Sequence, residues 1–188
     1  MTRLRPSSAR SSVGFSAAIH RLLLGAALLL TACRKEPSPE SLVGRQAPAI
    51  KLDTLEHGRF YLQEQRGKPV VLVFWDTSCQ ICKRELVEVE ALRATIGPEK
   101  VAVAGVCQDP ENIDLARALV QGLGLGFPTL LDQEGRVSKA YGVSGFPTTI
   151  VISPTGKIGF VREGYTEPLM VQLRSTVQGY LEGSSHAP

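Results

Sequence analysis

The chain has 188 residues, 43% of them hydrophobic, which is enough for one globular domain with an additional segment. It carries 21 basic and 18 acidic residues, and four of the arginines lie in the first 32 residues, where there is no acidic residue. The remainder has 17 basic and 18 acidic residues and no basic cluster interleaved with aromatic side chains, so we discard nucleic-acid binding.

The N-terminal segment has the pattern of a secretory signal peptide over residues 1–32, in which arginines precede the apolar run Leu22–Leu30. That run is too short to span a bilayer. It ends in Leu-Thr-Ala-Cys33, which resembles the lipobox of bacterial lipoproteins and implies cleavage before Cys33 and its lipidation. The alternative is an ordinary signal peptide with an incidental cysteine. Residues 33–46 are polar and proline-rich and are expected to form a tether, followed by the folded domain over 47–183.

Hydrophobic periodicity and turn residues predict the elements of that domain. In chain order we expect a β-hairpin over 50–55 and 58–62, a strand over 69–75, a helix over 80–96, a strand over 101–107, a helix starting at Asp109-Pro110-Glu111, a strand over 127–131, a short helix over 137–141, antiparallel strands over 146–152 and 157–162, and a closing helix from Thr166. Strands that alternate with helices favour an α/β fold whose central sheet is covered on both faces.

The most informative motif is Cys79-Gln-Ile-Cys82, which lies between a buried strand pattern and an amphipathic helix pattern. This position puts Cys79 at the start of the helix, where unpaired amide groups and the helix dipole favour an anion. The ionised Cys79 thiol is therefore the expected nucleophile. Cys82 follows one turn later on the inward face and is placed to attack a mixed disulfide at Cys79. The pattern indicates thiol–disulfide exchange.

The stretch Phe74–Glu85 resembles the active-site region of TlpA/ResA-like thioredoxins, which are membrane-tethered thiol–disulfide oxidoreductases of the bacterial cell envelope. Gly145-Phe-Pro-Thr-Thr149 matches that family's second landmark, and the resemblance covers about residues 44–183. It implies a thioredoxin-like fold with a central mixed sheet and an N-terminal β-hairpin, and no cofactor. It also implies a lipid anchor at Cys33 that faces the periplasm, disulfide-containing exported proteins as substrates, and a redox partner in the membrane.

The resemblance further implies that a cis peptide bond precedes Pro147 beside the cysteine pair. Because proline has no N–H donor, a cis bond there would leave the preceding backbone free to pair with a substrate strand. Pro147, Phe146 and Trp75 are therefore candidate substrate contacts. The alternatives are a trans proline that merely begins a strand, and a tryptophan that belongs to the core.

Glu85 matches an acidic residue that this family often carries three positions after the second cysteine. It falls on the same helical face as Cys82. A carboxylate in that half-buried place would have a raised pKa and could take the proton from the resolving thiol. The alternative is a solvated charge at the rim of the helix.

Three positions depart from the family pattern. Ser78 replaces the usual tryptophan, Gln80-Ile81 replaces a dipeptide that usually has proline before the second cysteine, and Asp76 replaces a small residue. These residues flank the reactive sulfur, so the direction of electron flow stays open, with reduction of apocytochrome c or copper-site proteins favoured. Asp76 could oppose the helix dipole or simply hydrogen-bond the turn, and the sequence does not choose.

Weaker signals leave other functions to weigh. Cys107 ends a neighbouring strand, where a buried free cysteine is commoner than one that shuttles a disulfide. With the cysteine pair and His57 it makes no convincing zinc site. A peroxiredoxin-like thiol peroxidase is the second candidate function, but that family resembles Pro-x-x-x-Thr-x-x-Cys, and neither residue stands at those offsets from Cys79. A copper metallochaperone is the third, and it lacks the usual Met and His ligands.

Overall fold

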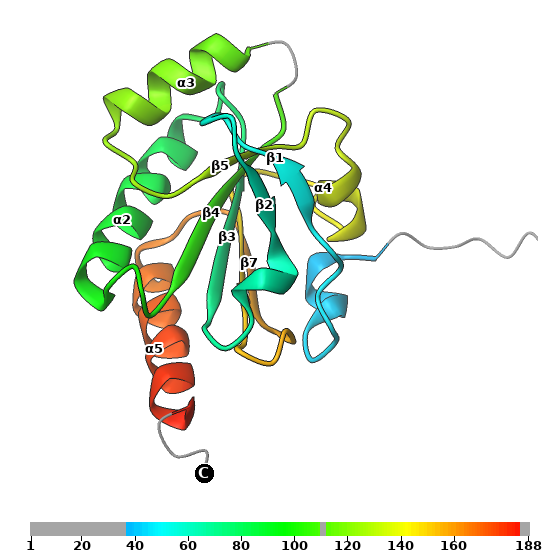
Figure 1. Ribbon diagram of the computed structural model, residues 1–188, viewed down its shortest axis with the longest axis vertical. Coiled ribbons are helices and arrows are strands. Elements are labelled where there is room, and N and C mark those ends of the chain that lie inside the picture. The colour runs from blue at the N-terminus through cyan, green and yellow to red at the C-terminus, as the bar shows by residue number, and fades with distance from the viewer. Residues whose placement is uncertain (1–36, 110–111, 185–188) are drawn as a thin grey trace, which may run out of the picture. The chain divides into compact units, whose positions relative to one another are not determined.

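A computed structural model describes residues 37–109 and 112–184, and it confirms the α/β class (Figure 1). The signal peptide, Cys33 and the first residues of the tether lie outside this part of the chain. Five strands form one sheet in the order β5-β4-β3-β6-β7. Their bounds are β3 Val70–Trp75, β4 Ala102–Cys107, β5 Thr129–Leu131, β6 Thr148–Ile152 and β7 Ile158–Glu163. β3, β4 and β5 are parallel, whereas β6 and β7 pair antiparallel, so the sheet is mixed as expected.

The helices cover both faces of this sheet. They are α2 Gln80–Ile96, α3 Ile113–Gly122, α4 Arg136–Ala140 and α5 Glu167–Ser184. The crossovers β3-α2-β4 and β4-α3-β5 step in the same direction along the sheet, so right-handed connections put α2 and α3 on one face. Figure 1 shows α5 on that side as well and α4 on the opposite side.

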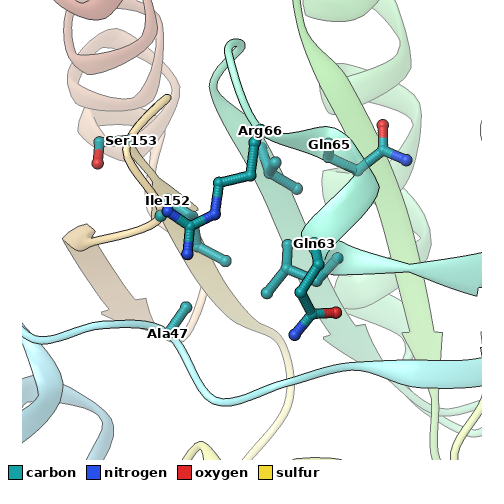
Figure 2. Close-up of a pocket in the computed structure, with 9 residues that line it drawn as sticks. Ala47, Gln63, Gln65, Arg66, Ile152 and Ser153 are labelled. Atoms are coloured by element: carbon teal, nitrogen blue, oxygen red, sulfur yellow. The ribbon is translucent and has the colours of Figure 1, made fainter.

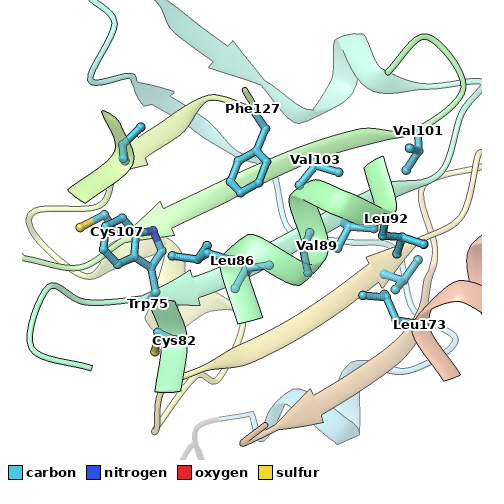
Figure 3. Close-up of a cluster of buried hydrophobic side chains, with 14 of the residues drawn as sticks. Trp75, Cys82, Leu86, Val89, Leu92, Val101, Val103, Cys107, Phe127 and Leu173 are labelled. Carbon is cyan, nitrogen blue, oxygen red and sulfur yellow. The ribbon is translucent and has the colours of Figure 1, made fainter. Parts of the chain in front are cut away.

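The core is divided between the two faces because all six residues of the central strand β3 are buried. One cluster joins α2 to the sheet through Trp75, Leu86 and Val89 (Figure 3). The other cluster lies under α4 and includes Phe74 and Tyr141, whose hydroxyl donates a hydrogen bond to the Pro48 carbonyl at 2.7 Å. Removal of this apolar surface from water stabilises the packing of α2 and α4 against the two faces of the sheet.

The expected N-terminal hairpin is present as a separate two-stranded antiparallel sheet. Its strands are β1 Lys51–Asp53 and β2 Arg59–Tyr61, and a 3₁₀-helix, η2 Leu62–Gln65, follows. The boundary expected between tether and domain needs correction, because η1 (Pro39–Leu42) buries both of its end residues. Gly44 N–H donates to the Ile158 carbonyl at 2.7 Å, so the chain is packed against β7 well before Ala47. Burial of Leu42 outweighs the polar composition of this segment.

The start of α3 also differs from the expectation. Asn112 is the N-cap of this helix, which begins at Ile113 rather than directly after Asp109. The Asp109 carboxylate instead accepts hydrogen bonds from the Thr77 hydroxyl and from the Asn112 side chain (3.0 Å). A capping signal in the sequence is thus used to connect two loops at the edge of the sheet.

Candidate active site

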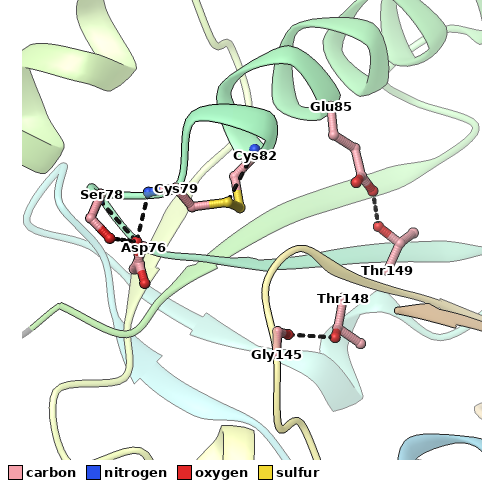
Figure 4. The surroundings of a disulfide bond; sticks show 8 residues. All are labelled: Asp76, Ser78, Cys79, Cys82, Glu85, Gly145, Thr148 and Thr149. Carbon is pink, nitrogen blue, oxygen red and sulfur yellow. Dashed lines mark hydrogen bonds between the residues drawn. A yellow bond between two sulfur atoms is a disulfide. The ribbon is translucent and has the colours of Figure 1, made fainter. Parts of the chain in front are cut away.

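The cysteine pair lies where β3 passes into α2, at the carboxyl end of the central strand (Figure 4). Cys79 is the N-cap of α2 and Cys82 is in its first turn, and the two form a disulfide with Cα atoms 5.3 Å apart. The Cys82 N–H points at the Cys79 sulfur at 3.2 Å. Cys79 is half-buried whereas Cys82 has no exposed surface. A partner molecule can therefore reach only the first sulfur, as the motif predicts.

Asp76 shapes the turn before the pair. Its Oδ1 accepts hydrogen bonds from the N–H groups of Ser78 (2.9 Å) and Cys79 (2.8 Å) and from the Ser78 hydroxyl (2.8 Å). This is an Asx-type turn, in which a short acidic side chain satisfies backbone donors two and three residues on. Of the two roles considered for Asp76, hydrogen bonding of the turn is thus present.

Glu85 is fully buried one turn after Cys82 on the inward face of α2. Its Oε1 accepts a hydrogen bond from the Thr149 hydroxyl, and its Oε2 has no hydrogen-bond partner among the described residues (Figure 4). Burial raises the pKa of Glu85 from 4.5 to about 7, although the Thr149 hydrogen bond acts in the opposite direction. The alternative of a solvated charge at the helix rim is wrong.

The Phe146–Pro147 peptide bond is cis, as the resemblance implied. β6 pairs with β3 in a register that sets Thr148 opposite Phe74, so Pro147 lies next to the end of β3 and the loop that leads to Cys79. The Pro147 carbonyl accepts a hydrogen bond from Gly164 N–H at 2.8 Å. No backbone hydrogen bond among the described residues involves the half-buried Phe146.

Two other candidates belong to the core. Trp75 has no exposed surface, so the expectation that it contacts substrate is wrong. Its indole packs in the cluster under α2 because the residue lies on the face of β3 that α2 covers. Cys107 pairs with Trp75 in the sheet register and is a buried free cysteine. Burial, followed by the charges of Asp109 and Asp76, raises the pKa of Cys107 to about 12.

Two parts of this region were not assigned a role from the sequence. Thr149 is the hydrogen-bond partner of Glu85, and the only signal for it is the second threonine of the Gly-x-Pro-Thr-Thr motif. The Thr77–Asp109 hydrogen bond joins the loops after β3 and β4, and no sequence spacing reports it. Both contacts connect segments that are far apart in the chain.

Other features of the described residues do not compete with this site. A small pocket between η2 and the end of β6 (Figure 2) lies at the end of β3 that is opposite the cysteine pair. Beside it Arg66 donates a hydrogen bond to the Thr155 carbonyl at 2.6 Å. No group of three or more potential metal ligands occurs within the described ranges. No helix in the same part of the chain has the length and apolar character needed to cross a membrane.

The fold and the place of the disulfide within it define a thiol–disulfide oxidoreductase with a thioredoxin-like architecture, and the comparisons with known proteins agree. The profile of the AhpC/TSA family matches residues 43–161. The chain is 35% identical over 129 residues to thiol-disulfide oxidoreductase ResA of Halalkalibacterium halodurans, covering 69% of this chain and 73% of that protein. It is 33% identical over 122 residues to thioredoxin-like protein YneN of Bacillus subtilis, covering 64% and 71%.

Solved structures show the same fold. A putative thiol:disulfide interchange protein DsbE from Chlorobium tepidum superposes with a TM-score of 0.67 at 24% identity, covering 72% of this chain and 95% of that one. A putative protein disulfide isomerase from Bacteroides thetaiotaomicron gives 0.68 at 24% identity, covering 77% and 92%. The chain therefore belongs to the AhpC/TSA family, and thiol-disulfide oxidoreductases named ResA are among its relatives.

Proposed function

We propose that this protein reduces disulfide bonds in exported proteins at the membrane surface of the cell envelope. The observation that carries the proposal is the unequal burial of the pair, with Cys79 half-buried at the start of α2 and Cys82 fully buried. In the reduced enzyme the Cys79 thiolate attacks a substrate disulfide, which forms a mixed disulfide and releases one substrate thiol. The Cys82 thiolate then attacks the Cys79 sulfur, releases the second substrate thiol and leaves the enzyme disulfide.

Glu85 is the proposed acceptor of the Cys82 proton in the second step. Its place one turn along the same face of α2 and its burial both support this role. A carboxyl with a pKa of about 7 is partly ionised at neutral pH, so it can take up a proton and return it without a large penalty. The Thr149 hydroxyl holds Oε1 and leaves Oε2 available.

The loop before β6 is the proposed contact for the substrate chain. The backbone of Phe146 is unpaired among the described residues and stands beside the end of β3, so an extended substrate segment could pair with it. Ile81 lies between the two cysteines and is 43% exposed, which offers an apolar contact beside the reactive sulfur. Pro147 would position this loop rather than donate to the substrate.

Each turnover leaves the enzyme oxidised, so a reductant must return two electrons to the pair. A thiol protein in the membrane would fit an enzyme that is anchored there. The anchor we propose is an acyl modification of Cys33, which is supported by its lipobox sequence and by the arginines and apolar run before it.

Replacement of Cys33 by alanine is expected to release the protein from the membrane. A sequence that lacks the lipidated cysteine keeps the export signal but loses its acyl chains, and peripheral binding by the domain alone would be weak. Fractionation of cells that produce the full chain would measure this. The matched Cys107→Ala variant should remain with the membrane, and equal release of both variants, or retention of Cys33→Ala, would contradict the anchor.

Assays of two substrates separate the proposed function from the peroxidase alternative. The full-length protein is expected to accelerate insulin reduction by dithiothreitol and to consume hydrogen peroxide no faster than free thiols do. The physical reason is that Asp76, rather than a threonine, occupies the position three residues before Cys79, and its carboxylate binds the amides of the turn. Rapid peroxide turnover without insulin reduction would reverse the assignment.

A further inference from the structure

Asp76 holds a carboxylate against the backbone directly before α2 (Figure 4). One oxygen, Oδ1, takes the N–H groups of both Ser78 and Cys79. Amides and the positive end of the dipole at a helix start generally stabilise an anion, which at this site would be the Cys79 thiolate. In this chain a carboxylate occupies part of that environment in the disulfide form.

A second carboxylate lies in the same region, at the carboxyl ends of β3 and β4. Asp109 follows the end of β4, and hydrogen bonds from Thr77 and Asn112 lower its pKa, so it stays ionised at neutral pH. The charges of Asp109 and Asp76 both add to the effect of burial in raising the pKa of Cys107. The ends of β3 and β4 therefore lie in a negative field next to the cysteine pair.

We propose that the charge of Asp76 makes the Cys79–Cys82 pair a stronger reductant by disfavouring the Cys79 thiolate. The inference rests on the proposed function, in which Cys79 is the nucleophile, and deepens it by naming a residue that favours the reductive direction. Reduction of the disulfide consumes two electrons and two protons, or one proton fewer when Cys79 is ionised. A charge that disfavours the thiolate moves this equilibrium toward the disulfide, so the dithiol gives up its electrons more readily.

The elements next to Cys79 carry other ionisable groups. They are Cys82, Lys83 and Glu85 on α2, and Cys107 and Asp109 at the end of β4. Residues 145–147 of the loop before β6 contribute none, and Glu163 at the end of β7 faces this loop, where its Oε2 accepts a hydrogen bond from the Ser144 hydroxyl at 3.4 Å. A neutral substitution at Asp76 leaves all of these groups in place, so the difference between the two proteins reports Asp76 itself.

The test is Asp76→Asn in the full-length protein. Asparagine keeps an oxygen acceptor for the same N–H groups and removes only the charge. The proteins are equilibrated with glutathione buffers over a range of pH, and peptide mass spectrometry after alkylation gives the reduced fraction of the pair. Above the pH midpoint of Cys79 alkylation we expect the equilibrium constant for reduction to rise about tenfold, or about 30 mV. The midpoint itself should move to lower pH.

The pH dependence of the reduction potential distinguishes an effect of the Asp76 charge from a structural effect of the substitution. Below both alkylation midpoints neither protein holds a thiolate, so the two potentials should coincide there. A merely structural role of Asp76 would shift the potential equally at every pH, and this outcome would overturn the inference. So would unchanged potentials, or a pair that becomes more reducing. Asp76→Ser, a second neutral acceptor for the turn, should behave as Asp76→Asn does.

Glu99→Gln provides the matched control because it removes one exposed negative charge beyond the far end of α2. Its potential should equal that of the unaltered protein. Failure of this inference is distinguishable from failure of the proposed function. If Cys79→Ser abolishes insulin reduction while Asp76→Asn leaves the potential unchanged, only the role of Asp76 is lost.

Discussion

Cys79→Ser is expected to abolish insulin reduction, with a loss on the order of a thousandfold or more. Serine fits the same N-cap position, since its hydroxyl also accepts from the helix amides, so the fold should be retained. What disappears is the only sulfur of the pair that a substrate can reach, because Cys82 has no exposed surface. The rate of insulin precipitation in the presence of dithiothreitol measures the effect.

Cys82→Ser is expected to distinguish the roles of the two cysteines, because it should trap the mixed disulfide at Cys79. The first attack remains possible but no thiol is present to resolve the mixed disulfide, so covalent complexes with substrate proteins should accumulate on non-reducing gels. The double variant, with serine at both positions, should trap nothing. Cys107→Ala should retain full activity, since burial keeps that thiol protonated. Full activity in Cys79→Ser, or trapping through Cys107, would contradict the assignment.

Glu85→Gln is expected to alter how stability depends on pH. The folded-state pKa of Glu85 is raised to about 7 from 4.5, so the folded protein retains a proton that the unfolded chain releases in this window. The free energy of unfolding should therefore fall as pH rises from 4.5 to 7, by about 3 kcal/mol in total. Glutamine does not titrate, so this decline should be absent in the variant. Urea unfolding at pH 5, 6, 7 and 8 measures it.

The same substitution should slow the reaction. Loss of a general base typically costs on the order of a hundredfold or more, and here the loss should fall on resolution of the mixed disulfide, above pH 7 in particular, where Glu85 is ionised. Glu99→Gln is the control for removal of a carboxylate near the same helix. If the free energy of unfolding of the wild-type protein depended on pH as little as that of the variant, Glu85 would be ionised over the whole pH range measured. An unchanged pH–rate profile would argue against the proton role.

Local patterns predicted the framework of this site because the physics that sets it is local. The buried run of β3 and the inward face of α2 have clear periods, so the position of Cys79 between them follows from the sequence. The antiparallel strands β6 and β7 were likewise expected, and the cis bond before Pro147 came from the family resemblance. The class of chemistry could be predicted because it requires only these features.

The predictions for Trp75 and for the start of the domain were wrong because tertiary packing, rather than local sequence, determines which of these residues are buried. Trp75 is a residue type that can form a substrate contact, but it lies on the face of β3 that α2 covers and is fully buried. The segment that includes Leu42 is polar on average, but burial of Pro39 and Leu42 and backbone hydrogen bonds to Ile158 attach it to β7. Thr149, the partner of Glu85, and Thr77, which donates to Asp109, come from other segments, and nothing in the sequence near Glu85 or Asp109 specifies them.

Because the folded part of the chain begins early, an anchored enzyme could move only a short distance away from the membrane surface. Since η1 begins at Pro39, only residues 34–38 separate it from the proposed acylated cysteine. Five residues extend to about 18 Å at most, which is less than the width of the domain itself. Such a short tether would hold the active site within a thin layer above the lipid headgroups, so substrate proteins would have to approach the bilayer.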